Sequence, residues 1–179
     1  MAQRGDVEWF ERGFVEGDLK GVFLVFAATN DRDIQSRIMT EAVKNDVLIN
    51  SVDDPGGSDF HVPAHFRRGN MLVTVATGGG SPALARMLRQ QLEESLDPGY
   101  EAVVDLMGLI RDKIVARDDD FDGHGYLFRR LLEKDLVELT LNEQWFDLQK
   151  MLLEELPKDL DAVNLMKNFL ENHDRSDIG

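Results

Sequence analysis

The sequence predicts an α/β protein whose second half is purely helical. Residues 21–28 and 47–52 are almost unbroken apolar runs, which are typical of strands buried in a parallel sheet. Residues 33–45 lie between them and place Ile34, Ile38, Ala42 and Val43 on one face of a helix. From Ser81 onward, apolar residues recur at three- and four-residue spacing. A chain of 179 residues is long enough to bury a core.

The expected elements follow from these patterns in chain order. Strand, helix and strand over residues 21–52 form a βαβ unit, for which we expect a right-handed crossover. Short strands are expected at residues 7–10 and 59–62, with a turn at 53–57. A further strand over 66–76 contains Arg68-Gly69-Asn70, a candidate hairpin turn. Helices are expected at residues 82–96, 100–117, 126–141, 143–156 and 158–172.

Composition and charge exclude several classes of protein. The net charge is −14, and residues 91–179 alone carry 22 Asp and Glu against 10 Lys and Arg. Such an acidic surface argues against nucleic-acid binding. No apolar run reaches the roughly 18 residues of a membrane span, so we expect no membrane association. The chain has no cysteine, which fits the reducing cytoplasm, where we expect it to reside.

A glycine-rich loop at residues 77–82, Thr-Gly-Gly-Gly-Ser-Pro, joins an expected strand to an expected helix. Ser81 is a candidate N-cap, and Pro82 suits the first helical position. The free N–H groups of a helix start attract anions, and glycine lets a ligand approach the backbone. Four arginines that could support such a site flank the loop: Arg67, Arg68, Arg86 and Arg89.

Polar loops follow the two buried strands. Residues 27–31, Ala-Ala-Thr-Asn-Asp, come after the first strand, and residues 50–55, Asn-Ser-Val-Asp-Asp-Pro, come after the second. Ligands of open α/β sheets bind at this carboxyl edge. A carboxylate there could accept a proton from a ligand, or it could simply cap a helix or a turn. The sequence leaves both interpretations open.

The histidines do not predict a metal site. His61, His65, His124 and His173 are scattered, and Pro63 prevents the first two from forming a helical pair.

Taken in register, four motifs resemble the siroheme synthase N-terminal family. They are residues 27–31, residues 50–55, residues 60–64 (Phe-His-Val-Pro-Ala) and residues 77–86. The resemblance covers about residues 5–95, whereas the later helices match only in kind.

The resemblance implies a fold and an activity. Its members are homodimers with a Rossmann-like NAD-binding domain, a central dimerisation segment and a helical C-terminal domain. These parts correspond here to residues 1–62, 63–96 and 97–179. Members oxidise the tetrapyrrole precorrin-2 to sirohydrochlorin with NAD, and some then insert ferrous iron.

The resemblance also implies roles for individual residues. Asp53 corresponds to the family's key acid. The cofactor side would include Ala28, Thr29, Asn30 and Asn50. The substrate side would include His65, Arg67, Thr77, Gly78, Gly79, Ser81 and Arg86.

The chain also departs from the family pattern. Members begin with a strand, a glycine-rich loop, a helix and a second strand that are not in this sequence, and that loop holds the pyrophosphate of NAD. The Rossmann-like sheet is therefore expected to be truncated, and NAD binding to be weakened or absent. A truncated or mis-started version of a longer enzyme, a partner chain that completes the sheet, and a reduced homologue all remain open. The activity would then be dehydrogenation, metal insertion alone, or non-catalytic binding of a tetrapyrrole or metal by a dimer; a purely structural module is a further option.

Overall fold

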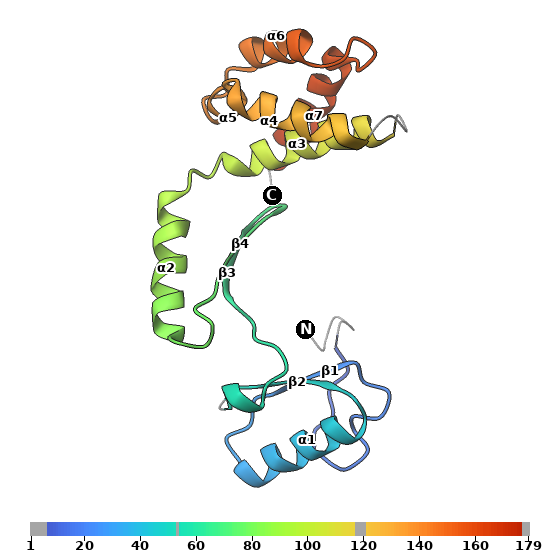
Figure 1. Ribbon diagram of the computed structural model, residues 1–179, viewed down its shortest axis with the longest axis vertical. Coiled ribbons are helices and arrows are strands. Elements are labelled where there is room, and N and C mark those ends of the chain that lie inside the picture. Colours follow the sequence, from blue (N-terminus) through green and yellow to red (C-terminus); the bar gives the residue numbers. More distant parts are fainter. Residues whose placement is uncertain (1–6, 53, 117–120, 177–179) are drawn as a thin grey trace. The chain divides into compact units, whose positions relative to one another are not determined.

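The computed structural model describes residues 7–52, 54–116 and 121–176. The chain divides into two compact units, Met1–Pro63 and Ala64–Gly179, which are described separately. Figure 1 shows the strands and the helix of the first unit and the hairpin and helices of the second.

The first unit is a βαβ unit, as expected. Strand β1 (Leu24–Ala27) and strand β2 (Leu48–Ser51) are parallel, with Val25 opposite Ile49. Helix α1 (Arg32–Lys44) connects them. The core of the unit consists of Leu19, Ala27, Ile38, Ala42, Val47 and Ile49. The alternate residues of both strands therefore face the helix. The expectation that Val43 shares the helix face of Ile38 is wrong: Val43 is 74% exposed, because residues five apart on a helix point about 140° away from each other.

The second face of this sheet differs from the expectation. An unbroken apolar run predicts burial on both faces, but Leu24, Phe26 and Leu48 are 40%, 54% and 42% exposed. The reason is that the described part of this unit offers one helix, and α1 covers one face only. The expected strands at residues 7–10 and 59–62 do not form either.

A buried carboxylate on α1 holds the segment of chain that leads into β1. Glu41 of α1 is 6% exposed, and its Oε1 accepts hydrogen bonds from the backbone N–H groups of Gly17 (2.9 Å) and Leu19 (3.1 Å). An acid on α1 thus replaces strand pairing as the partner of these two donors.

Changing Glu41 to alanine is expected to destabilise the protein by about 1–3 kcal/mol, because two N–H groups lose their acceptor. Glu41→Gln keeps an acceptor oxygen of similar size and should lose less than half as much. Urea unfolding followed by circular dichroism measures both. Equal losses for the two variants would contradict this role.

An exposed ion pair between Arg12 and Asp18 links two points of the same segment before β1. Arg12 donates to both carboxylate oxygens of Asp18 at 2.7 Å, which lowers the pKa of Asp18 from 3.8 to about 2. Because the pKa of the folded state lies below the ordinary value, the stabilisation is present above about pH 4. It is lost as the pH falls toward 2.

The second unit begins with a β-hairpin backed by a helix. Strands β3 (Ala64–Arg68) and β4 (Met71–Val75) are antiparallel, and the turn at Gly69 and Asn70 is the expected one. Helix α2 (Pro82–Ser95) packs against both strands and buries Phe66.

Five further helices complete the unit. They are α3 (Tyr100–Val115), α4 (Phe121–Glu133), α5 (Leu136–Leu141), α6 (Trp145–Glu155) and α7 (Ala162–Ser176). Their core includes Leu106, Leu131, Leu136, Leu148 and Phe169. Glu155 of α6 pairs with Arg130 (2.5 Å) and Lys134 (3.5 Å) and so ties α6 to the end of α4. None of the helices in the described ranges has the length and apolarity needed to cross a bilayer.

The expectation of a single helix over residues 126–141 is wrong. The chain breaks at Lys134 and Asp135 and forms α4 and α5. Leu131 and Leu136 are both fully buried. On one continuous helix, residues five apart point about 140° away from each other. The break lets both leucines reach the same core.

Candidate functional site: the carboxyl edge and the glycine loop

The loop after β1 is held by its own side chains. Asp31 caps α1, because its Oδ1 accepts from the N–H groups of Asp33 (2.9 Å) and Ile34 (3.1 Å). The N–H of Asp31 donates to Thr29 Oγ1 at 3.2 Å. Asp31 is thus a structural cap, whereas Ala28 and Asn30 are exposed at the carboxyl edge of the sheet.

A cavity of about 630 Å³ lies beside this loop. It is lined by Thr29, Asn30, Asp31, Arg32, Gln35, Ser36, Met39 and Asp54. The amide of Gln35 donates to Ser51 Oγ, while its Oε1 is buried without a hydrogen-bond partner among the described residues. A ribose hydroxyl would supply that missing donor, and Arg32 could face a phosphate. The cavity therefore fits part of a dinucleotide.

Gln35 is the residue that the sequence reasoning missed. It lies one turn after the Asp31 cap, on the side of α1 that faces β2. Its place in the first turn of a helix that follows a polar βα loop is the signal that could have identified it.

The loop after β2 is closed by Ser58 and Asp59. Ser58 Oγ accepts from the N–H of Ser51 (2.9 Å) and donates to the carbonyl of Asp54 (2.9 Å). Asp59 pairs with Ile49 of β2 through its N–H (2.8 Å) and its Oδ2 (2.9 Å). The backbone on both sides of residue 53 is thereby fixed to β2.

Two further side chains of this loop, among the residues described, are hydrogen-bonded. The amide of Asn50 donates to the carbonyl of Phe60 at 2.7 Å. Asp54 Oδ1 accepts from the N–H of Gly57 at 3.1 Å, and a Cβ on Gly57 would lie 2.5 Å from Asp54 Oδ2. Asp54 is therefore the carboxylate that caps the turn. Asp53, the candidate acid, lies outside the described residues.

The glycine loop of the second unit is locked at both ends. The Thr77 hydroxyl accepts from the N–H of Ser81 and donates to its carbonyl, each at 3.1 Å. Ser81 caps α2 by accepting from the N–H of Leu84 at 3.2 Å, as predicted. Gly78 and Gly79 have φ of 58° and 80°, and no atom lies within 4 Å of a Cβ built on either. Their backbone is therefore open to a ligand.

The four arginines that flank this loop in the sequence divide into two pairs. Arg68 donates to the carbonyls of Glu93 (2.5 Å) and Leu96 (2.6 Å) at the end of α2, and Arg89 pairs with Glu93. These two are used within the protein. Arg67 and Arg86 are exposed and have no ionic partner in the described ranges.

We expect Arg67→Ala to weaken ligand binding and Arg68→Ala to lower the stability of the protein. Removing Arg68 exposes the end of α2 and should lower stability by about 1.5–3 kcal/mol, the value of hydrogen bonds to a charged group. Removing Arg67 should leave stability unchanged and weaken tetrapyrrole binding about fivefold, as for one exposed ion pair. Thermal unfolding and absorbance titration with sirohydrochlorin measure the two effects. A loss of stability in Arg67→Ala would refute the division.

The hairpin brings part of the candidate substrate residues together. Ala64 pairs with Val75, so His65 lies at the end of the hairpin from which the glycine loop departs. Arg67 pairs with Leu72 near the turn, on the same face as His65 and opposite α2. Ala28, Thr29, Asn30 and Asn50 belong to the other unit. Within the described ranges, no three histidine or acidic side chains lie close enough to hold a metal ion.

Known proteins match this chain both at the level of a family model and as individual relatives. Residues 1–64 match a family model described as "Putative NAD(P)-binding". Siroheme synthase 3 of Aeromonas hydrophila is 33% identical over 141 residues, which are 79% of this chain and 30% of that protein. Siroheme synthase 1 of Pectobacterium atrosepticum is 31% identical over 163 residues, or 91% of this chain and 34% of that protein. The chain thus spans about a third of these relatives.

A solved structure has the same fold. The structure of "SirC, precorrin-2 dehydrogenase" matches with a TM-score of 0.62 at 21% identity, over 83% of this chain and 74% of that chain. The α/β unit followed by a hairpin and helices is therefore the fold of that protein. Together with the sequence relatives, this makes the chain similar to siroheme synthases over most of its own length and over about a third of theirs.

Proposed function

We propose that this protein acts in siroheme biosynthesis as a cytoplasmic homodimer that oxidises precorrin-2 to sirohydrochlorin with NAD. The observation that carries the proposal is the cavity at the carboxyl edge of β1, which is lined by Thr29, Asn30 and Asp54. The siroheme synthases of the comparison and the NAD(P)-binding family model over residues 1–64 support it.

The first unit would hold the cofactor. Gln35 Oε1 and Thr29 face ribose hydroxyls in this proposal, and Ala28, Asn30 and Asn50 shape the edge on which the cofactor lies. NAD, when bound, supplies the acceptor for the hydride. The protein's own task is to orient the substrate and to take up the proton that leaves with the hydride. We assign that task to Asp53, because a carboxylate at the carboxyl edge of a strand is well placed to act as a base.

The second unit would bind the substrate. Precorrin-2 carries many carboxylates, and the N-terminus of α2 offers N–H groups above Gly78 and Gly79. Thr77 and Ser81 hold this loop, Arg86 lies exposed one turn into α2, and His65 and Arg67 lie exposed on the hairpin face opposite α2. Charge-assisted hydrogen bonds from arginine to carboxylate suit such a ligand.

The homodimer is proposed for the hairpin. One face of the two-stranded sheet packs on α2, and the other exposes Leu72. A two-stranded hairpin is marginal alone, and a second copy packed on this face would bury Leu72 and support the hairpin. Analytical ultracentrifugation should give twice the mass of the chain, and a monomer at micromolar concentration would contradict this part.

The test of the activity uses the whole chain with precorrin-2 and NAD under anaerobic conditions. Appearance of sirohydrochlorin and NADH in equal amounts, with many turnovers per chain, supports the proposal. A spectral shift that stops at one tetrapyrrole per chain supports a binding protein instead and overturns it. A parallel sample with sirohydrochlorin and ferrous iron, without NAD, tests metal insertion. Metallation there, with no oxidation in the first sample, would make the protein a chelatase only.

A further inference from the structure

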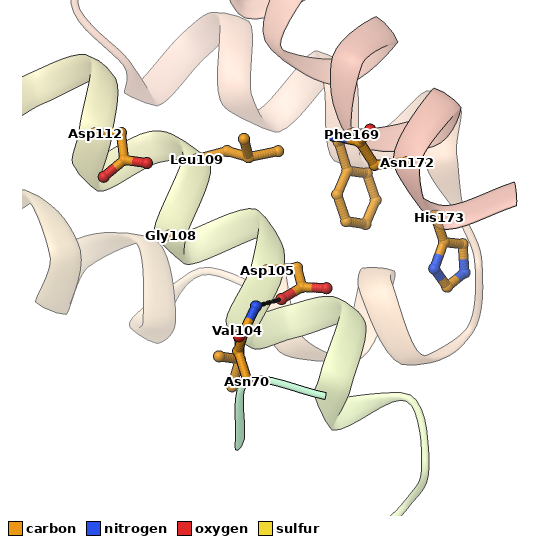
Figure 2. Close-up of a pocket in the computed structure, with 9 residues that line it drawn as sticks. All are labelled: Asn70, Val104, Asp105, Gly108, Leu109, Asp112, Phe169, Asn172 and His173. Carbon is orange, nitrogen blue, oxygen red and sulfur yellow. Dashed lines mark hydrogen bonds between the residues drawn. The ribbon is translucent and has the colours of Figure 1, made fainter. Parts of the chain in front are cut away.

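A second cavity lies within the helical unit, away from the glycine loop. It has a volume of about 410 Å³ and is formed by the hairpin turn, α3 and α7. Nine residues line it: Asn70, Val104, Asp105, Gly108, Leu109, Asp112, Phe169, Asn172 and His173. Figure 2 shows the α3 residues on one side of the gap and the α7 residues on the other. We call this cavity the α3–α7 groove.

The groove has a carboxylate toward each end. Asp105 and Asp112 are seven residues apart, two turns along the same face of α3, or about 10 Å along the helix axis. Asn70 donates to Asp105 Oδ1 at 2.9 Å, which orients that carboxylate and leaves its Oδ2 available (Figure 2). Asp112 is exposed, and its side-chain carboxylate has no hydrogen-bond or ion-pair partner among the residues the structure describes.

The floor between the carboxylates is bare and apolar. Gly108 lies in the middle of α3, where glycine is disfavoured relative to alanine, yet no atom lies within 4 Å of a Cβ built on it. Packing therefore does not require a glycine at this position. Its effect is to keep open the space between the two carboxylates, opposite Leu109 and Phe169.

The α7 wall is rigid. The His173 ring stacks on Phe169 with an interplanar angle of 10°, and Trp145 meets both rings edge-on. Phe169 is 2% exposed, so the wall is anchored in the core of the unit.

We propose that the α3–α7 groove binds a linear dication, an alkyl chain with an ammonium group at each end. Asp105 and Asp112 would each accept from one ammonium group, and the methylene chain would lie over Gly108 against Leu109 and Phe169. The surplus of acidic residues over residues 91–179 raises the local concentration of such cations. This site is independent of precorrin-2 oxidation.

The test is calorimetric titration of the whole chain with octamethylenediamine at physiological salt, with octylamine and spermidine alongside. Octamethylenediamine should bind about fivefold more tightly than octylamine, because only the diamine makes the second ion pair. Spermidine carries a third ammonium group within its chain, which would lie over the apolar floor, so it should bind more weakly than octamethylenediamine. Equal affinity for octylamine and the diamine would overturn the proposal, as would binding of neither amine.

Variants distinguish binding in the α3–α7 groove from non-specific attraction to the acidic surface. Asp105→Asn and Asp112→Asn should each weaken the diamine about fivefold and together about 25-fold. Gly108→Leu should abolish binding, because its side chain fills the floor, while circular dichroism confirms that the helices are intact. Glu154→Gln removes one exposed charge on α6 and should change nothing. A loss with Glu154→Gln equal to that with Asp112→Asn would overturn the proposal.

Discussion

Replacing Asp53 by asparagine should lower the rate of precorrin-2 oxidation by about 10²- to 10⁴-fold, the usual contribution of a positioned base. Asparagine has nearly the same shape and cannot accept the proton. The fixed flanks of the loop, held by Ser58 and Asp59, predict that the fold tolerates the change. Anaerobic initial rates of NADH formation at saturating precorrin-2 measure the effect, and circular dichroism confirms folding.

The neighbouring residue provides the matched control. Asp54 caps the turn at Gly57, so Asp54→Asn removes one charge from the same loop. Asparagine can still accept that hydrogen bond, and the rate should stay within a few-fold of the original. If Asp53→Asn oxidises precorrin-2 as fast as the unaltered chain, Asp53 is not the base. If the oxidation rate falls equally in both variants, the negative charge of the loop is what the reaction requires, rather than proton transfer to Asp53.

The largest effect on stability is expected for Leu131→Ala. Leu131 is fully buried in the helical core, and truncation of a buried leucine to alanine costs about 2–5 kcal/mol. The loss combines transfer of apolar surface with the cavity that is left. Urea unfolding followed by far-ultraviolet circular dichroism reports it, because most of the helices lie in this unit.

Leu132 is the matched control, since it is the next residue on α4 and is 51% exposed. Leu132→Ala makes the same chemical change without a cavity and should change stability by less than about 0.5 kcal/mol. Similar losses for the two variants would mean that α4 packs through a different face.

The fold could be predicted where the sequence pattern is local. Two apolar runs around an amphipathic segment gave the βαβ unit, and Arg68-Gly69-Asn70 gave the hairpin turn. The sequence pattern gave wrong expectations where burial depended on which other helix or strand packs against the segment. The apolar run at residues 21–28 shows that the segment is hydrophobic. It does not show whether a second helix covers Phe26. The break between α4 and α5 was missed because Leu132, Leu136 and Leu139 continue one apolar stripe at helical spacing, and only the burial of both Leu131 and Leu136 required a break.

The candidate site shows the same limit. Ser81 could be identified as an N-cap because capping depends on a few neighbouring residues. The four arginines could not be sorted, since the partners of Arg68 are carbonyls 25 and 28 residues away. Gln35 escaped notice because an unpartnered amide oxygen is a property of the packed structure. The assignments of Asp53 and of the cofactor and substrate residues stay predictions.

The two ends of α2 have a consequence for how fast and how tightly an anion can bind. Thr77 and Ser81 fix the loop at one end, and Arg68 fixes the other end to the hairpin about 20 Å away. The conformational entropy of the loop is therefore lost during folding and not again on association. A ligand that meets preordered N–H groups keeps more of its interaction energy as affinity, and its capture needs no rearrangement of the loop.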